Sequence, residues 1–499
     1  ALNINTTFFH KKSSSLIQDL KNFIINNFGF GDFIFRYKTG KEITRATSMA
    51  EFQKELENLP KKSLQFHASK NHFSNWIAVR GEFELASKLR KIKISNYSNL
   101  EDLRKVLLEN INLQMNENRD GKIVQFEPKT KSRKLSFVRM STGSLGGKAR
   151  GLAFASNLLK SADLESKYPE MVIRVPKIAV IGTDEFDEFM SNNKLWKIAF
   201  DDKKSDQSIT RAFLKASLSK NLRSTLTNYL NSVKFPLAIR SSSLLEDSQY
   251  QPLAGIYSTY MLANKDKSKS VRLGELEKAI KLVYASTFLN EPKSLIEASV
   301  HHHEEEKMAV IIMELAGKTH GDTFYPSASG LAQSFNYYPI SYMKRNEGVA
   351  YLALGLGRTI AEGEKSLRFA PKYPGLIPQY YSVNSTIDNS QNQFYALDVN
   401  KGGGLLKNSQ YENTSSYGLN KAEEDGELFW AGSVVSAIDN KIRDNLKDSG
   451  TRVITFPSLL KWNSVPAMDL IIDLLKIGQN ALGCPVEIEF AINLNKEAD

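Results

Sequence analysis

Near the start of the chain, apolar residues recur at every third or fourth position in the segments 15–28, 49–56 and 72–92. That spacing places them on one face of a helix, so three amphipathic helices are predicted. A fourth helix is predicted over 99–115, where Asn99 can cap it and acidic residues fill its first turn. The candidate core positions of 72–92 are Phe73, Trp76, Ile77, Phe83, Ala86 and Leu89.

Two short strand-like runs, 32–37 and 41–47, flank a Thr-Gly turn and predict a hairpin. Together with the helices they indicate a small α+β domain over 1–135, whose role the sequence does not reveal. The polar, basic stretch 116–134 is the predicted linker at its end.

From 136 to 499 the pattern changes, because strand-like runs now alternate with amphipathic helical segments such as 273–289. This alternation is typical of an α+β or α/β domain with a mixed sheet. The strand-like runs are VIRVPKIAVIG, FPLAIR, YSTYML, KMAVIIM and VEIEFAI.

The overall composition is that of an ordinary globular protein. Of 499 residues, 41% are hydrophobic and 24% are charged, so a normal core can be buried. The net charge of +11 is compatible with nucleic acid, an anionic surface or a nucleotide as partner. Because 66 cations stand against 55 anions, a mildly basic protein without such a partner is the simpler interpretation.

Cysteine content and the chain start bear on the compartment. Cys484 is the single cysteine, which excludes an internal disulfide and a thiolate zinc cluster; we expect it to be a buried structural thiol. The start of the chain lacks the apolar stretch of a secretory signal, and runs such as 308–313 are too short to span a bilayer. A cytoplasmic location is therefore expected. The first residue is Ala1, as in a processed chain or a fragment.

A Gly-rich turn with a lysine precedes a helical segment at 141–154. Gly146 and Gly147 would let backbone amides approach a phosphate, and Lys148 would add a mobile charge. The pattern is not a Walker A loop, since Ala149 follows the lysine. Taken alone, the turn is more typical of an ordinary capped helix start.

A strand-like run at 235–240 ends on Arg240 and is followed by three serines. An arginine at a strand end can bind phosphate oxygens with two donors, and Ser241 and Ser242 offer hydroxyls and amides. Further polar residues, Glu246 and Asp247, come before Ala254-Gly255. A structural turn with an ordinary ion pair is about as compatible with this pattern.

Near the end of the chain, Glu487 and Glu489 alternate with apolar residues in CPVEIEFAINL. On a strand they would share one face at roughly 6.6–7 Å along the chain. Paired carboxylates suit Mg²⁺, which prefers oxygen ligands and bridges nucleotide phosphates. A half-buried strand with a wet acidic face is the commoner explanation of this pattern alone.

In order and spacing, these clusters resemble the ATP-binding domain of the phosphoenolpyruvate synthase and pyruvate phosphate dikinase family. The resemblance covers about 138–495. It is carried by LGGKARGLAFASNLL, RVPKIAVIGTDEF, LAIRSSSLLEDSQYQPLAGIYSTYML, KMAVIIMELAG, ASGLAQSFN, LGLGRTIAEG and VEIEFAI.

The resemblance implies an ATP-grasp-like fold in which two subdomains hold Mg·ATP, with mixed sheets behind the small α+β domain. Lys148 and Arg240 would act on the ATP phosphates, aided by Gly146, Gly147, Ser241 and Ser242. The loop around Gly255 would cover the phosphates. Glu314 to Ala316 would lie beside the adenine. Glu487 and Glu489 would hold Mg²⁺.

Four positions depart from the family pattern. Met313 stands where the family has glutamine, Ile256 replaces the glutamine after Ala-Gly, and Arg358 replaces the glutamate of GLGE. Val486-Glu487 stands in place of Gln-Asp. These changes affect the expected adenine and metal contacts, so the fold is better supported than catalysis.

In the family, the β-phosphoryl group of ATP passes to a histidine on a separate swivelling domain and then to pyruvate. None of the seven histidines lies in the family's acceptor motif. The resemblance therefore implies a phosphotransferase of dikinase type whose acceptor lies on a longer chain or a partner chain. The alternatives are a non-catalytic nucleotide-binding regulatory or scaffold module, and a dikinase for a glucan or drug hydroxyl.

Other polar clusters favour structural explanations. The run His301 to Glu306 makes a poor metal chelate, because adjacent helical side chains point in different directions. His67 and His72 are expected to be packed or hydrogen-bonded. The basic runs 88–93 and 129–134 lack interleaved aromatics, so nucleic acid and membrane are not predicted as partners. The Gly-rich stretch 401–404 fits a ligand-covering loop or a surface turn.

Overall fold

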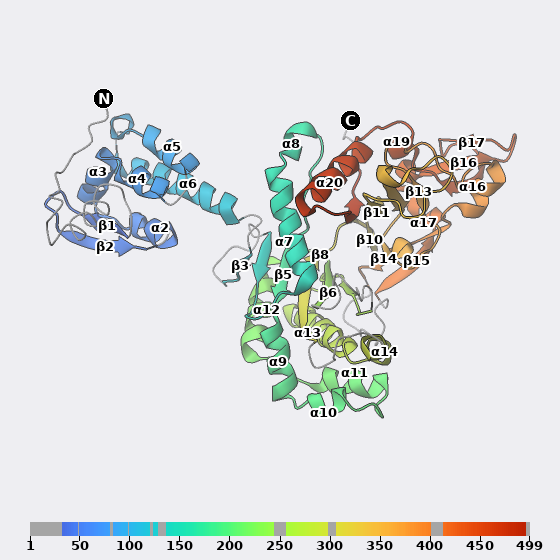
Figure 1. Ribbon diagram of the computed structural model, residues 1–499, viewed down its shortest axis with the longest axis horizontal. Helices are drawn as coiled ribbons and strands as arrows, with labels where there is room; N and C mark the ends of the chain where they lie inside the picture. Colours follow the sequence, from blue (N-terminus) through green and yellow to red (C-terminus); the bar gives the residue numbers. More distant parts are fainter. Residues whose placement is uncertain are drawn as a thin grey trace. The chain divides into compact units, whose positions relative to one another are not determined.

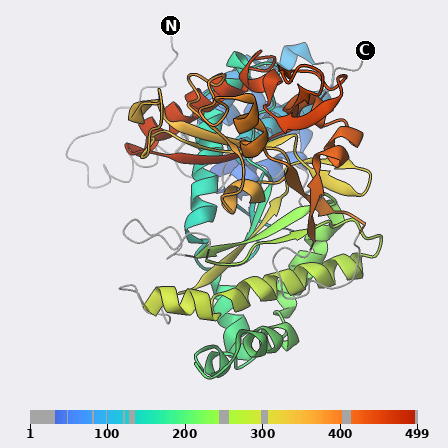
Figure 2. The same ribbon diagram turned by 90° about the vertical axis from the view of Figure 1, so that its right-hand side faces the viewer.

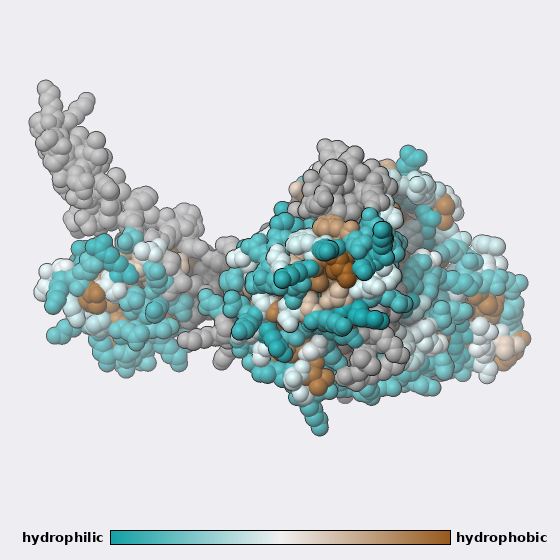
Figure 3. All heavy atoms as spheres, turned by 90° about the horizontal axis from the view of Figure 1, so that it is seen from below, coloured by the Kyte–Doolittle hydropathy of each residue, from teal (hydrophilic) through white to brown (hydrophobic). Residues whose placement is uncertain are grey.

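The computed structural model describes residues 32–47, 49–79, 83–97, 99–119, 123–127, 136–243, 256–297, 306–400 and 413–495. The chain divides into two compact units, 1–119 and 120–499, each with its own hydrophobic core (Figure 1). Among the described residues, no helix combines the length and apolar character needed to cross a bilayer. The surface in view in Figure 3 is mainly hydrophilic with scattered apolar spots, as is usual for a surface facing water.

The first unit packs an antiparallel hairpin against helices. Gly40, with φ of +89°, lies in the turn of the hairpin, and the predicted strands and helices at 32–57 and 99–115 are confirmed. The Asn99 side chain caps the last helix by accepting a hydrogen bond from the Glu101 amide at 3.0 Å. The elements are β1 (Phe33–Arg36), β2 (Glu42–Ala46), α2 (Met49–Glu57), α3 (Lys61–Ser69), α4 (His72–Val79), α5 (Phe83–Lys91), the 3-10 turn η1 (Ile94–Asn96) and α6 (Leu100–Arg119).

Segment 72–92 forms two helices, α4 and α5, where the sequence predicted one. Gly81 stands between them in the sequence, and glycine lowers helix propensity. The structure buries five of the predicted core side chains: Phe73, Trp76, Ile77, Ala86 and Leu89. The side chain of Phe83 and the segment 15–28 lie outside the described residues.

His67 and His72 are packed inside the first unit, as predicted. The Arg36 amide donates to Nε2 of His67 at 3.0 Å, and the two Nδ1 atoms lie 3.1 Å apart. Because Nε2 of His67 is an acceptor, Nδ1 of His67 must carry the proton that it shares with His72. Burial lowers the pKa of His67 to about 3 and that of His72 to about 4, so both rings are neutral near pH 7.

The second unit has two lobes. In the described part of the first lobe, a mixed six-stranded sheet runs in the order β3-β4-β5-β8-β6-β7, with β3, β4 and β5 parallel. Its strands are β3 (Val124–Gln125), β4 (Phe137–Arg139), β5 (Ile178–Ile181), β6 (Leu237–Ser243), β7 (Tyr260–Leu262) and β8 (Met308–Glu314). Its helices are α7 (Gly146–Ser161), α8 (Leu164–Lys167), α9 (Thr183–Asn192), α10 (Trp196–Ala199), α11 (Asp206–Lys215), α12 (Lys220–Ser232), α13 (Lys269–Ser286) and α14 (Asn290–Glu297).

The second lobe follows the short connection 315–317 and carries three sheets among its described residues (Figure 2). The first two are β15 (Thr414–Gly418)-β14 (Gln393–Asp398)-β10 (Thr323–Tyr325)-β9 (Lys318–His320) and β13 (Leu367–Phe369)-β12 (Val349–Ala353)-β11 (Ala328–Gln333)-β19 (Glu487–Ile492). The third is β17 (Ile442–Arg443)-β16 (Gly432–Ser436)-β18 (Gly450–Ile454). The helices are α15 (Arg358–Ala361), α16 (Val383–Asn389), α17 (Leu419–Glu424), α18 (Leu428–Ala431), α19 (Pro457–Leu460) and α20 (Ala467–Leu482), with the 3-10 turn η4 (Arg345–Glu347).

The predicted α+β class is confirmed. In the described part of the chain the six-stranded sheet is mixed, and the other sheets are antiparallel. Part of the predicted linker is regular structure, because α6 continues to Arg119 and β3 pairs with β4 in the sheet of the second unit. The division between the units falls after Arg119, whereas the sequence placed it at 135.

The prediction that Cys484 is buried is wrong, since the thiol is exposed. Cys484 follows Gly483, which ends α20 in a left-handed conformation with φ of +68°. The chain turns there toward the edge strand β19, so apolar and small neighbours in sequence do not place this residue in a core.

Candidate functional site

The Gly-rich turn before α7 is braced by hydrogen bonds from strands and from α9. Arg139 donates to the Gly143 carbonyl at 2.6 Å. The Ser144 amide donates to the Thr183 hydroxyl at 2.9 Å, and the Thr183 amide donates to the Ser144 carbonyl at 3.0 Å. The turn therefore has a fixed shape, and α7 begins from it at Gly146.

Ser242 of β6 is bound to the start of α7. Its hydroxyl donates to the Leu145 carbonyl at 2.8 Å and accepts from the Ala149 amide at 3.1 Å. Gly146 has φ of +76°, and a Cβ there would lie 1.8 Å from the Ser242 carbonyl oxygen. The sequence predicted that the Ser242 hydroxyl would face ATP; in the structure it faces the helix, with Lys148 on the adjoining first turn.

Arg240 and Glu489 bring the predicted phosphate site and the predicted metal site together. Nη1 of Arg240, on β6 of the first lobe, lies 3.5 Å from Oε2 of Glu489, on β19 of the second lobe. The Glu489 side chain is 69% exposed and that of Arg240 is 26% exposed. Ser241, next to Arg240, is buried in the sheet.

The alternation predicted for β19 is present. Glu487 and Glu489 are exposed on one face, while Ile488 and Phe490 lie on the other and pack against the core of the second lobe. Gly330 of β11 makes room for Phe490, because a Cβ there would lie 2.0 Å from the phenyl ring. The two carboxylates are thus held on the open side of the sheet by the packing beneath them.

Gln333 joins this face from β11, and the sequence gave no reason to single it out. Its Nε2 donates to Oε2 of Glu487 at 2.6 Å, which fixes the carboxylate. Two carboxylates on an open face fit Mg²⁺, which fills its remaining positions with water and nucleotide oxygens. In the described ranges, no cluster of three or more His, Cys, Asp or Glu side chains could hold a metal by itself.

At the connection between the lobes, the Glu314 carboxylate is already bound. Arg174 donates to its two oxygens at 2.5 and 3.0 Å, and the Lys177 amide donates at 3.2 Å. Burial raises the pKa of Glu314, but these hydrogen bonds outweigh it, so the pKa lies below its ordinary value. An adenine beside this segment would therefore meet backbone groups. In the described part of the chain, the Ala316 amide donates no backbone hydrogen bond.

The departures from the family pattern occupy different places. Met313 lies in β8 opposite Ile178, and Ile256 is half-buried against the first-lobe core. Arg358 begins α15, where its guanidinium lies 4.2 Å from the Tyr395 ring centre and pairs with Glu362 at 2.9 Å. Its charge is thus held within the second lobe.

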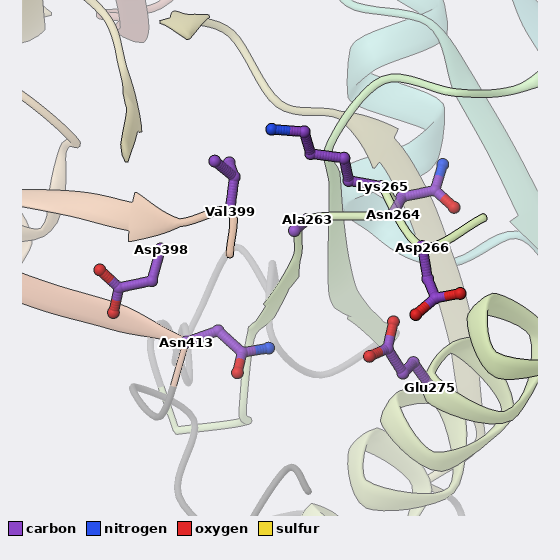
Figure 4. A pocket seen from close by; sticks show the side chains of 8 residues that line it. All are labelled: Ala263, Asn264, Lys265, Asp266, Glu275, Asp398, Val399 and Asn413. Carbon is purple, nitrogen blue, oxygen red and sulfur yellow. The ribbon is translucent and has the colours of Figure 1, made fainter. Parts of the chain in front are cut away.

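A polar pocket lies between the lobes (Figure 4). Asn413 of the second lobe donates to the Met261 carbonyl of β7 at 2.9 Å, a second contact across the lobes. None of the described residues predicted to bind ATP lines this pocket. Its lining is Ala263, Asn264, Lys265, Asp266, Glu275, Asp398, Val399 and Asn413.

Some predicted features lie outside the described residues: Gly255, the Glu246-Asp247 pair, the run 301–305 and the Gly-rich stretch 401–404. The start of α7, which contains Gly146, Gly147 and Lys148, is bound to Ser242 of β6, and Arg240 on the same strand pairs with Glu489. Glu314 and Ala316 lie at the connection between the lobes.

Two known families match parts of the chain. Residues 142–498 match the AMP/ATP-binding domain of pyruvate phosphate dikinase. Residues 42–145 match a family of unknown function, DUF5752, and this match extends from the first unit into β3 and β4. A search among curated proteins gave no significant match. Because the first match covers most of the chain, the protein belongs to the family of the pyruvate phosphate dikinase AMP/ATP-binding domain.

Proposed function

We propose that the second unit binds Mg·ATP between its lobes and transfers the β-phosphoryl group to a histidine on a separate swivelling domain. This is the role of the corresponding domain in phosphoenolpyruvate synthase-like enzymes. The single observation that supports the proposal best is the approach of Arg240 and Glu489 to 3.5 Å from opposite lobes. One charge is suited to phosphate and the other to Mg²⁺.

In this proposal the chain contributes positioning and charge rather than covalent chemistry. Arg240 and Lys148 neutralise phosphate oxygens from the first lobe. Glu487 and Glu489 hold Mg²⁺, which supplies further neutralisation of the phosphates when bound. Attack of the acceptor histidine nitrogen on the β-phosphorus breaks its bond to AMP, so AMP leaves and the β- and γ-phosphoryl groups move together to the histidine. The γ-phosphoryl group then passes to water or inorganic phosphate, which leaves the β-phosphoryl group on the histidine.

The acceptor histidine belongs to a swivelling domain on a longer chain or a partner chain. Of the histidines that the structure describes, His67 is buried and His72 is half-buried in the first unit, and His320 lies beside Glu427 at 3.7 Å in the second lobe. None is placed on the face that carries Glu489. This arrangement favours an acceptor supplied from outside the described residues.

A second candidate function is a regulatory module that binds nucleotide without transfer. Arg358, at the position of a family glutamate, favours it because its charge opposes that of the residue it replaces. Transfer to another acceptor, such as a glucan or drug hydroxyl, would keep the same ATP site. Formation of AMP from Mg·ATP in the presence of a matching phosphohistidine domain distinguishes transfer from simple binding.

The first test is calorimetric titration of the full chain with ATP, in Mg²⁺ and in EDTA. We expect Mg²⁺-dependent binding in the wild type and its loss in Arg240→Ala. The matched control is Arg223→Ala, which removes an exposed arginine paired with Glu277 at 2.9 Å on the helices of the first lobe. Equal binding by Arg240→Ala and the control, or no binding by folded wild type, would contradict the proposal.

A further inference from the structure

We infer that Ser242 is a positioning residue, which sets the direction of Lys148 by holding the first turn of α7 to β6. This inference rests on the proposed ATP site. It assigns Ser242 a role different from direct contact with phosphate, which is what its place beside Arg240 in the sequence predicts.

The hydrogen-bonding capacity of the hydroxyl decides between the two roles. A serine hydroxyl has one proton to donate, and a phosphate oxygen can only accept. The Ser242 proton goes to the Leu145 carbonyl at 2.8 Å, and the Ala149 amide takes one acceptor position at 3.1 Å. The residue is also fully buried. Phosphate would have to displace an existing buried hydrogen bond to use this hydroxyl.

The same hydroxyl bonds to chain on both sides of Lys148. Leu145 precedes Gly146, where the chain enters α7, and Ala149 follows Lys148 directly. Gly146 approaches the Ser242 backbone so closely that no side chain fits between them. The segment from Leu145 to Ala149 therefore packs against β6 at its start, and the Ser242 hydroxyl is hydrogen-bonded to both of its ends. Lys148 lies within this segment, so the orientation of its side chain depends on these two hydrogen bonds.

Loss of the hydroxyl should therefore act on binding through Lys148. In Ser242→Ala the Ala149 amide and the Leu145 carbonyl lose a buried partner, which costs more than removal of an exposed hydrogen bond. The first turn can then rotate, and small displacements of a charged group weaken its contact with a ligand strongly. We expect ATP to bind roughly tenfold more weakly to this variant.

The test is a double-mutant cycle on the full chain, with ATP dissociation constants measured in Mg²⁺ for wild type, Lys148→Met, Ser242→Ala and the double variant. If Ser242 acts through Lys148, the factor by which Lys148→Met raises the ATP dissociation constant should be at least about threefold smaller in the Ser242→Ala background than in wild type. The matched control is Ser390→Ala. Ser390 is a buried serine of the second lobe that likewise accepts from an amide, Ile454, at 2.7 Å and donates to a carbonyl, Gln391, at 3.3 Å.

A second measurement does not need ATP. Hydrogen exchange of the peptide that covers the start of α7 should speed up in Ser242→Ala and stay unchanged in Ser390→Ala. Additive losses in the cycle, or unchanged exchange in Ser242→Ala, would overturn the inference. If wild type binds no ATP while exchange still speeds up in Ser242→Ala alone, the proposed function fails and the positioning of the turn stands.

Discussion

Nη1 of Arg240 lies 3.5 Å from Oε2 of Glu489, so a side chain suited to phosphate and one suited to Mg²⁺ neutralise each other across the two lobes. Because the carboxylate is largely exposed, the pair contributes little stability, in the range of about 0–1 kcal/mol. In the proposed site, ATP without metal would have to displace Glu489 from Arg240 and would then face the repulsion of that carboxylate. With Mg²⁺ present, the metal would give Glu489 a new partner.

The first prediction is that Glu489→Gln affects ATP binding in opposite directions with and without metal. In Mg²⁺ the variant should bind more weakly than wild type, since one metal ligand loses its charge. In EDTA it should bind about two- to fivefold more tightly, because Arg240 is no longer neutralised and the repulsion is gone. Calorimetry in the two buffers measures both.

Glu423→Gln is the control for that experiment, since Glu423 pairs with Arg452 at 2.8 Å within the second lobe. It should leave both dissociation constants unchanged. Weaker binding by Glu489→Gln in EDTA would show that the carboxylate does not compete with ATP for Arg240.

The second prediction concerns Gly146. Gly146→Ala should lower the free energy of unfolding by more than about 2 kcal/mol, because the left-handed backbone disfavours a side chain and the new Cβ would overlap the Ser242 carbonyl. Gly151→Ala, within α7 and with open space around its Cβ position, should raise it by up to about 1 kcal/mol. Urea unfolding of both variants measures the contrast, and similar values would mean that α7 does not start as described.

The third prediction is that acid destabilises the first unit through His67. Its pKa is about 3 in the folded chain, below the unfolded value of about 6.5. The unfolded state therefore binds the proton more readily. The contribution of neutral His67 to the free energy of unfolding is fully present above about pH 6.5 and decreases as the pH drops toward 3. The slope should approach about 1.4 kcal/mol per pH unit for each such histidine.

Urea unfolding at several pH values, followed by the fluorescence of the buried Trp76, measures this slope. Trp196, Trp430 and Trp462 of the second unit are first replaced by phenylalanine so that Trp76 alone reports. His67→Gln should flatten the pH dependence. A first unit equally stable at pH 4 and pH 7 would contradict the buried, neutral assignment.

The fourth prediction is that Asp473 fastens the lobes. It accepts from Tyr168 at 2.7 Å and pairs with Lys167, which joins α20 to the end of α8. Asp473→Ala should lower the free energy of unfolding of the second unit by about 1–2 kcal/mol. Asp469→Ala, one turn earlier on α20, should have little effect because its nearest described partner, Asn463, lies at 3.5 Å. Equal losses of unfolding free energy in the two variants would show that Asp473 does not hold the lobes together.

The parts of the fold that follow a local period could be predicted from the sequence. The alternation in VEIEFAI placed Glu487 and Glu489 on one face, and the apolar run at 308–313 became the buried strand β8. Each of these depends on a few neighbouring residues, so a short stretch of sequence contains the information.

The roles that depend on distant partners could not be predicted. The Ser242 hydroxyl meets Ala149, which is 93 positions away in the chain, and the Glu314 carboxylate meets Arg174, which is 140 positions away. In the sequence, a polar residue of a motif that resembles a phosphate-binding motif looks the same whether its side chain faces a ligand or another part of the chain. The exposure of Cys484 was missed for a related reason, because a turn after α20 overrides the apolar character of its neighbours.

Along the described chain, the path passes from the first lobe to the second only once, at 315–317. Each lobe is therefore a continuous stretch of sequence, and the rest of their association is non-covalent. It includes the cluster of Leu164, Tyr168 and Leu470, the contacts of Asp473 with Tyr168 and Lys167, the hydrogen bond from Asn413 to Met261 and the pair of Arg240 and Glu489. A protein of this kind can be divided at the crossing. Two separately produced halves, joined through these surfaces, would form a complementation pair.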